Sequence, residues 1–161
     1  MCNCCDAIRA VHCVGMASVS GIKRDALDAI FSDCVRLAAN CCEAHGEPML
    51  HGNIQCSDNL ECAHIHGRRY QIVRHDPMNA VSLCGAHHRW YTDHPVFFTQ
   101  WLNRHLGPEH LDILREKLQT THKWLNGMKA EARKHYRNEY KLMVEQRSRG
   151  ATGKLKFVGY L

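Results

Sequence analysis

Two neighbouring stretches near the middle of the chain decide how the sequence is interpreted. They are Glu61-Cys-Ala-His-Ile-His-Gly-Arg-Arg69 and Arg74-His-Asp-Pro-Met-Asn-Ala-Val-Ser-Leu-Cys-Gly-Ala-His-His88. Both lie in the segment 41–95, which holds more than half of the 10 Cys and 13 His taken together, along with several Gly, Asn and Pro residues. Short apolar runs between such turn-forming residues predict short strands and loops that lead into a helix.

Two pairs of ligand-type residues have the same spacing, Cys42-Glu-Ala-His45 and Cys84-Gly-Ala-His87. A pair separated by two residues can turn both side chains toward one cation, and two such pairs complete a tetrahedral set. The pattern therefore predicts a structural zinc site, against the alternative of ordinary buried Cys and surface His. The cysteines that remain open as substitutes are Cys41, Cys56 and Cys62.

The composition is otherwise that of an average globular domain. The 161 residues, 45% hydrophobic and 23% charged, suffice for one domain with an appended arm. Ten Cys would also suit a disulfide-stapled secreted protein, but the opening Met-Cys-Asn-Cys-Cys-Asp lacks the basic residues of a secretory signal. No apolar run reaches the roughly 18 residues of a spanning helix. We therefore expect bound metal, a cytoplasmic location and no membrane span.

Apolar residues at three- and four-residue steps predict helices on both sides of the central segment. The first covers residues 22–40, with Ser20 or Asp25 as its cap, and others cover 96–106 and, after the break at Gly107-Pro108, the residues that follow. A last helix covers about 128–146, and we expect 148–161 to be loose. The sequence thus predicts a mainly helical α+β fold in three parts: a Cys-rich segment 1–21, a central domain 22–126, and a basic helix and tail 127–161.

Positive charge is concentrated at the end of the chain. Residues 121–161 hold ten Lys and Arg against three Glu, a net charge of +7, which leaves −2 for the rest of a chain whose total is +5. A basic arm on a nearly neutral body favours nucleic acid as a partner, although a solvated helix face explains the charge equally well. The residues that fall mostly on one stripe of the last predicted helix are Lys129, Arg133, Lys134, Arg137 and Lys141.

The two central stretches resemble the HNH (ββα-metal) endonucleases, and most of all the phage recombination endonucleases of the Rap/NinG type. The resemblance rests on a His on a first strand, an Asn at the start of the return and a His on the following helix; here Asn79 and His88 follow His64 by 15 and 24 residues. It covers about residues 28–124 and implies a zinc-bound ββα-metal core flanked by helices. It also implies that His64 is the general base, that Asn79 holds the loop that orients it, and that His88 binds a catalytic Mg²⁺ or Mn²⁺.

The chain departs from the family at two positions. Many members carry Asp, Glu or His just before the base, where this chain has Ala63, and some carry a His four residues after the helix His, where it has Thr92. A second ligand for the catalytic cation must then come from elsewhere. Because His66 lies two positions from His64 and so shares its strand face, we expect His66 to be that ligand. The alternatives are Glu61 and Asp93.

The arginines between His64 and Asn79 are candidates for contacts to the DNA backbone, because a guanidinium can form paired hydrogen bonds with phosphate. They are Arg68, Arg69 and Arg74, and Arg133, Lys134 and Arg137 of the last helix extend the predicted DNA surface. Surface salt bridges are the alternative for the loop arginines. We expect His51 and His75 to be surface residues.

The sequence as a whole predicts a metal-dependent DNA endonuclease, and the resemblance suggests branched or recombining phage DNA in the host cytoplasm as its substrate. A homodimer would help to explain paired cuts. The alternatives are a non-catalytic zinc module that binds nucleic acid and a zinc-folded adaptor that docks on a protein. At the N-terminus, Cys2, Cys5, His12 and Cys13 could form a second zinc site, but we favour a mobile, reduced segment.

Overall fold

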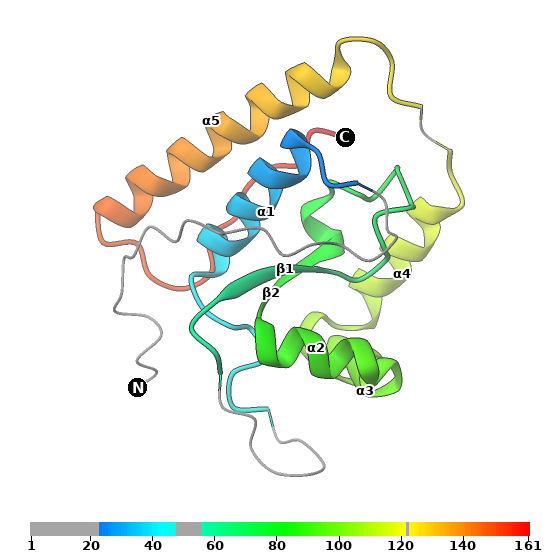
Figure 1. Cartoon of the computed structure of the whole chain (residues 1–161), viewed down its shortest axis with the longest axis vertical. Helices are drawn as coiled ribbons and strands as arrows, with labels where there is room; N and C mark the ends of the chain where they lie inside the picture. Colours follow the sequence, from blue (N-terminus) through cyan, green and yellow to red (C-terminus); the bar gives the residue numbers. More distant parts are fainter. Residues whose placement is uncertain (1–22, 48–55, 122) are drawn as a thin grey trace.

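The computed structural model describes residues 23–47, 56–121 and 123–161 (Figure 1). The N-terminal segment 1–21 with its possible second zinc site lies outside the described residues, and so does His51.

Helix α1 (Ala26–Ala39) confirms the first predicted helix and its cap. Asp25 accepts hydrogen bonds from the backbone N–H groups of Leu27 and Asp28, while the Asp28 carboxylate accepts from the Asp25 N–H, which forms a capping box. The helix ends where Asn40 takes the left-handed conformation, with φ of 58°. Its buried face includes Phe31, which is fully shielded from solvent.

A two-stranded antiparallel hairpin forms the centre of the molecule. Strand β1 (Leu60–His64) pairs with β2 (Ala80–Cys84), so that Leu60 faces Cys84 and His64 faces Ala80. The connection ends in the short 3-10 helix η2 (Pro77–Asn79). All residues of β2 are buried, because other elements cover both faces of the hairpin.

Three helices follow β2 without long connections, as Figure 1 shows: α2 (Gly85–Asp93), α3 (Pro95–Leu106) and α4 (Pro108–Leu118). Proline occupies the first turn of α3 and of α4, where its missing N–H costs nothing. The predicted break at Gly107 is confirmed by its φ of 85°, a conformation that glycine adopts without strain. Trp101 of α3 is 1% exposed and is a core residue.

The last helix, α5 (Met128–Ser148), lies alongside α1 (Figure 1). The tail that follows has no regular secondary structure, but it is not loose as we expected from its composition, since Leu155, Phe157 and Tyr160 pack against the α1–α5 cluster. The Leu155 N–H donates to the Ala38 carbonyl at 2.8 Å. The tail is thus part of the packed body.

Two apolar clusters lie on opposite sides of the hairpin. One joins α1, α5 and the tail; the other joins the Cys42 turn, β2, α2 and α3. The predicted mainly helical α+β class is therefore confirmed. Within the described ranges, no helix combines the length and apolar character that crossing a membrane requires.

Candidate metal centre and candidate active site

Four ligand-type side chains converge beside the hairpin. They are Cys42, Cys56, Cys84 and His87, and their ligand atoms all lie within 4.8 Å of one another. Cys42 follows α1, Cys56 precedes β1, Cys84 ends β2 and His87 lies in the first turn of α2. Three thiols and an imidazole are a donor set typical of structural zinc. The group can therefore hold a metal ion such as zinc.

The distances within this group match a tetrahedral site. The Nδ1 atom of His87 lies 3.6 Å from the sulfur of Cys42, 3.8 Å from that of Cys56 and 3.0 Å from that of Cys84. Zinc bonds of about 2.3 Å to sulfur and 2.0 Å to nitrogen place neighbouring ligand atoms about 3.5 Å apart. Only small side-chain movements would be needed for all four to bind one ion.

The Cys42 turn is fixed by the residue that follows it. The Glu43 N–H donates to the Ser82 carbonyl at 2.8 Å, and the Glu43 carboxylate accepts from the Ser82 N–H at 2.9 Å. The other carboxylate oxygen lies 2.7 Å from His105 and 2.7 Å from Lys154. Glu43 thus ties the turn that carries Cys42 to β2, α3 and the tail.

The start of α2 is held equally closely. The Gly85 N–H donates to the Asn59 carbonyl at 3.1 Å, and a Cβ atom at Gly85 would lie 2.9 Å from the Asn59 side chain, which would have to move to admit it. The Cys84 sulfur caps the helix by accepting from the His87 N–H at 3.5 Å. A helix N-terminus favours the thiolate that a metal requires.

The thiols of the group differ in acidity. Burial raises the pKa of Cys84, but hydrogen bonds from the backbone and ring of His87 outweigh it and lower this pKa to about 6. Burial raises the pKa of Cys42 to about 11, and burial together with the charges of Cys42 and Cys84 raises that of Cys56 further. The negative charge of one thiolate disfavours ionisation of the next thiol, so a bound cation would be needed for all three to ionise.

Three of the four predicted zinc ligands come together, and the fourth position differs. His45 is exposed and lies outside the group; its Nδ1 atom lies 3.3 Å from the sulfur of Cys56, which occupies the place expected for His45. The short turn between Cys42 and His45 leaves the imidazole on the outside of the site. Cys56 reaches the site from the chain that leads into β1.

His64 ends β1 on the face that α1 covers. Its Nε2–H donates to the Arg74 carbonyl at 3.0 Å, and its ring lies 6.0 Å from that of Phe31. The described residues offer no hydrogen-bond partner to Nδ1. Burial, followed by the nearby charge of Arg68, lowers the pKa of His64 to about 4, even though the bond to Arg74 acts in the opposite direction. The imidazole is therefore neutral at pH 7, with the Nδ1 lone pair available as a base.

Asn79 closes the connection between the two strands. Its Oδ1 accepts from the His66 N–H at 2.8 Å, and its Nδ2 donates to the carbonyls of His66 and Val73, both at 2.9 Å. The side chain is fully buried, so each of its hydrogen bonds is made inside the protein. Asn79 thus fixes the loop that begins directly after His64.

His88 of α2 pairs with Glu61 of β1. The Nδ1 atom of His88 lies 2.6 Å from a Glu61 carboxylate oxygen, and the two side chains are 36% and 42% exposed. Because side chains alternate along a strand, Glu61 shares its face with Ala63. The pair is therefore accessible and lies on the α2 side of the hairpin, opposite His64.

His66 lies two residues beyond the end of β1, so it does not share a strand face with His64 as we expected. Its ring lies 6.2 Å from that of Tyr70, and burial, with a smaller effect of Arg115, lowers its pKa. Within the residues that the structure describes, neither His64, His66 nor His88 belongs to a group of three metal-ligand side chains. The residue that contacts His88 is Glu61.

The loop arginines divide into two kinds. Arg69 is exposed and Arg68 half-buried, so both can reach a phosphate. Arg74 is 4% exposed and ion-paired with Asp28, so it is not placed to contact DNA as we expected. His75, predicted at the surface, is 6% exposed for the same reason, since it also binds Asp28. On α5, Lys134 and Arg137 are exposed and Arg133 is half-buried.

Comparison with known proteins returned no match: no protein-family model, no curated protein and no solved structure corresponds to this chain.

Proposed function

We propose that this protein is a metal-dependent HNH endonuclease that hydrolyses phosphodiester bonds in DNA. The observation that carries the proposal is the state of His64: one ring nitrogen is tied to the Arg74 carbonyl, the other is unpaired, and the ring is neutral at pH 7. A neutral imidazole with a free nitrogen can accept a proton from an attacking water.

The surroundings of His64 support the same proposal. Asn79 holds the following loop through three hydrogen bonds, which keeps the base and the backbone around it in one geometry. Arg68 and Arg69 follow on that loop and are suited to phosphate. Exposed Lys134 and Arg137 on α5 add positive surface. Binding through such residues weakens steeply as the salt concentration rises.

His88 and Glu61 are the residues that we propose as protein ligands of the catalytic Mg²⁺ or Mn²⁺. An imidazole and a carboxylate 2.6 Å apart and partly exposed suit such a cation, which usually keeps several waters and also binds substrate phosphate oxygens. When bound, the cation stabilises negative charge on the phosphate and the leaving oxygen. Glu61 replaces His66 as the second ligand in this proposal, because Glu61 already contacts His88. Since His64 is on the other face of β1, the proposal requires a scissile phosphate that reaches both the cation and His64 around the strand.

Zinc at Cys42, Cys56, Cys84 and His87 would be structural. A site with four protein ligands has no open position for a substrate. His87 and His88 are adjacent on α2, so the ion that binds the first would also fix the turn that presents the second. One metal ion would thus stabilise the fold, and a second would take part in catalysis.

The test is nicking of supercoiled plasmid with Mg²⁺ or Mn²⁺, with and without chelator. We expect His64→Ala to lower the rate at least about 100-fold, the contribution typical of a general base. We expect His88→Ala to lower it as well, because a ligand of the catalytic cation is lost. His135→Ala is the control, because its ring binds the Val158 carbonyl, packs beside the rings of Tyr136 and Tyr160, and has no part in the proposed site. Glu61→Gln should weaken Mn²⁺ binding, measured by electron paramagnetic resonance, whereas His66→Ala should not.

The result that would overturn the proposal is a folded, DNA-binding protein that nicks under no metal. It would favour the zinc-stabilised nucleic-acid-binding module, and the absence of both binding and nicking would favour the adaptor. Substrates to compare are plain duplex and branched DNA, since branched or recombining DNA is part of the proposal.

A further inference from the structure

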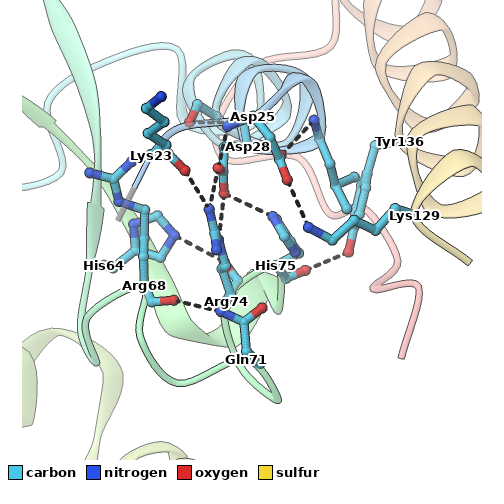
Figure 2. A network of polar contacts seen from close by, with 12 residues as sticks. Lys23, Asp25, Asp28, His64, Arg68, Gln71, Arg74, His75, Lys129 and Tyr136 are labelled. Carbon is cyan, nitrogen blue, oxygen red and sulfur yellow. Dashed lines mark hydrogen bonds and ion pairs between the residues drawn. The ribbon is translucent and has the colours of Figure 1, made fainter. Parts of the chain in front are cut away.

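Asp28 is an acidic residue on the buried face of α1. It is 2% exposed and lies among apolar residues of the α1–α5 cluster. Its two carboxylate oxygens accept from Arg74 at 2.8 and 2.5 Å, and from His75 at 2.9 Å. Figure 2 shows Arg74 and His75 reaching up from the loop to this one carboxylate. A single helix residue thus anchors two successive loop residues.

Such a buried ion pair needs a reason beyond stability. Removing two charges from water costs several kcal/mol, and packed apolar residues often replace a buried pair without loss. The other polar contacts suggest that this ion pair holds the loop in one position, because Arg74 also donates to the Lys23 carbonyl at 3.2 Å. The guanidinium is therefore held from two directions at the start of α1.

Three successive carbonyls of the anchored loop each accept from a different side chain. Asn79 binds the carbonyl of Val73, His64 binds that of Arg74, and Tyr136 of α5 binds that of His75. In Figure 2, His64 lies on one side of Arg74, and His75 and Tyr136 lie on the other. The position of the Arg74 carbonyl, and with it the ring of His64, depends on where the Arg74 and His75 side chains are held.

We propose that Asp28 is a positioning residue for His64: by anchoring Arg74 and His75, it holds the Arg74 carbonyl where only the Nε2–H form of the His64 ring can bind. That form leaves the Nδ1 lone pair free. The inference rests on the proposed function for its catalytic consequence, since Nδ1 is the atom that would accept the proton from water. The orientation of the ring is a property of the protein alone.

A metal ion at this place is the competing explanation. Asp25, Asp28 and His75 each have a ligand atom within 4.8 Å of the others. However, Arg74 and His75 already occupy both oxygens of Asp28, and a cation there would face the guanidinium charge. Asp25 in turn caps α1 and pairs with Lys129 at 3.0 Å. The group is an internal ion-pair network.

The test compares Asp28→Asn with Asp33→Asn. Asparagine keeps the shape of Asp28 but has no charge and places an NH2 donor where one carboxylate oxygen was, so it cannot accept from both nitrogens of Arg74. Asp33 is on the same helix, is 43% exposed and pairs with Arg36. The ring ¹⁵N chemical shifts of His64, assigned by their loss in His64→Ala, report which nitrogen carries the proton. Circular dichroism confirms that each variant is folded.

We expect the wild type and Asp33→Asn to show the Nε2–H form, and Asp28→Asn to show a mixture of the two forms. The nicking kcat of Asp28→Asn should fall at least about tenfold with little change in KM, because a wrongly protonated ring cannot act as a base. Unchanged shifts and rate in Asp28→Asn would overturn the inference. An Nδ1–H ring in the wild type would also overturn it, and this measurement does not depend on the folding of any variant. If the wild type cuts no DNA, the proposed function fails, and the ¹⁵N shifts still decide the role of Asp28.

Discussion

Cys56 and His45 compete for one position at the candidate zinc site. The sulfur of Cys56 lies close to the Nδ1 atoms of both His45 and His87, so either residue could be the outer ligand if the loop moved. Two differences favour Cys56. It is half-buried whereas His45 is exposed, and a thiolate added to Cys42 and Cys84 gives the Cys3His set that is common in structural sites.

Substitution separates the two residues. We expect Cys56→Ser to weaken zinc binding by more than the roughly 10- to 100-fold that loss of an outer-shell group causes, because a direct ligand is lost. His45→Ala should leave the affinity within a few-fold of the wild type. Competition with a chromophoric chelator measures both. Retained affinity in Cys56→Ser together with loss in His45→Ala would restore the ligand set that the two Cys-x-x-His motifs indicate.

This position also marks how far local spacing can predict a metal site. Cys42, Cys84 and His87 were predictable because each lies in a short motif with a second ligand-type residue. Cys56 has no such neighbour, and it reaches the group only because the chain before β1 passes the start of α2. Glu61 was only one of the alternatives for the second ligand of the catalytic cation. Spacing alone did not single it out, because its contact with His88 forms only when β1 lies beside α2.

At the scale of elements, α1 does more than cover the hairpin. Its apolar period was readable from the sequence, and so were its cap and its end. The period did not show that Asp28 faces inward, because a helix tolerates one polar residue among apolar ones. That single position explains why Arg74 and His75 are buried, although an arginine and a histidine in a loop are usually exposed.

The anchoring of the loop on α1 should depend on pH. Burial raises the pKa of Asp28, but the hydrogen bonds from His75 and Arg74 outweigh it and hold this pKa far below its usual value. A lowered pKa in the folded state stabilises the protein above the unfolded-state pKa of about 4, and this stabilisation is lost as the pH falls below it.

We therefore expect the free energy of unfolding of Asp28→Asn to be about 3 kcal/mol below that of the wild type at pH 7, since a buried charge loses its partner. The difference should shrink as the pH falls from about 4 toward 2. Urea unfolding at several pH values measures it, with Asp33→Asn as the reference. A difference that stays constant across this range would mean that the carboxylate charge is not what anchors the loop.

At the scale of the whole molecule, one short hairpin carries two apolar clusters. The α1–α5 side is built from large buried residues such as Phe31, Tyr136 and Met143. The other side contains the candidate zinc ligands Cys42 and Cys84 among its buried residues. Helix periodicity predicted most of the elements but not this division. The tail shows why: its contacts with α1 and α5 involve scattered residues without a period.

The division implies that the two sides respond differently to metal removal. Zinc binding adds to the folding free energy through its ligands, and local stability can vary across one domain. We expect chelation at pH 7 to increase hydrogen exchange in residues 42–47 and 84–93, while the amides around Phe31 in α1 and Met143 in α5 keep most of their protection. Hydrogen exchange with mass spectrometry resolves these segments.

Two controls make this experiment decisive. Added zinc should restore the protection, because its loss comes from the missing ion and not from cysteine oxidation. Met143→Ala should show the opposite pattern, since it opens a cavity on the α1–α5 side, where truncation of a buried methionine costs about 2–5 kcal/mol. If chelation instead increases hydrogen exchange in α1 and α5 as well as in α2, the loss of stability spreads through the hairpin to both clusters. The zinc site would then be a requirement for the whole fold, the proposed base His64 included.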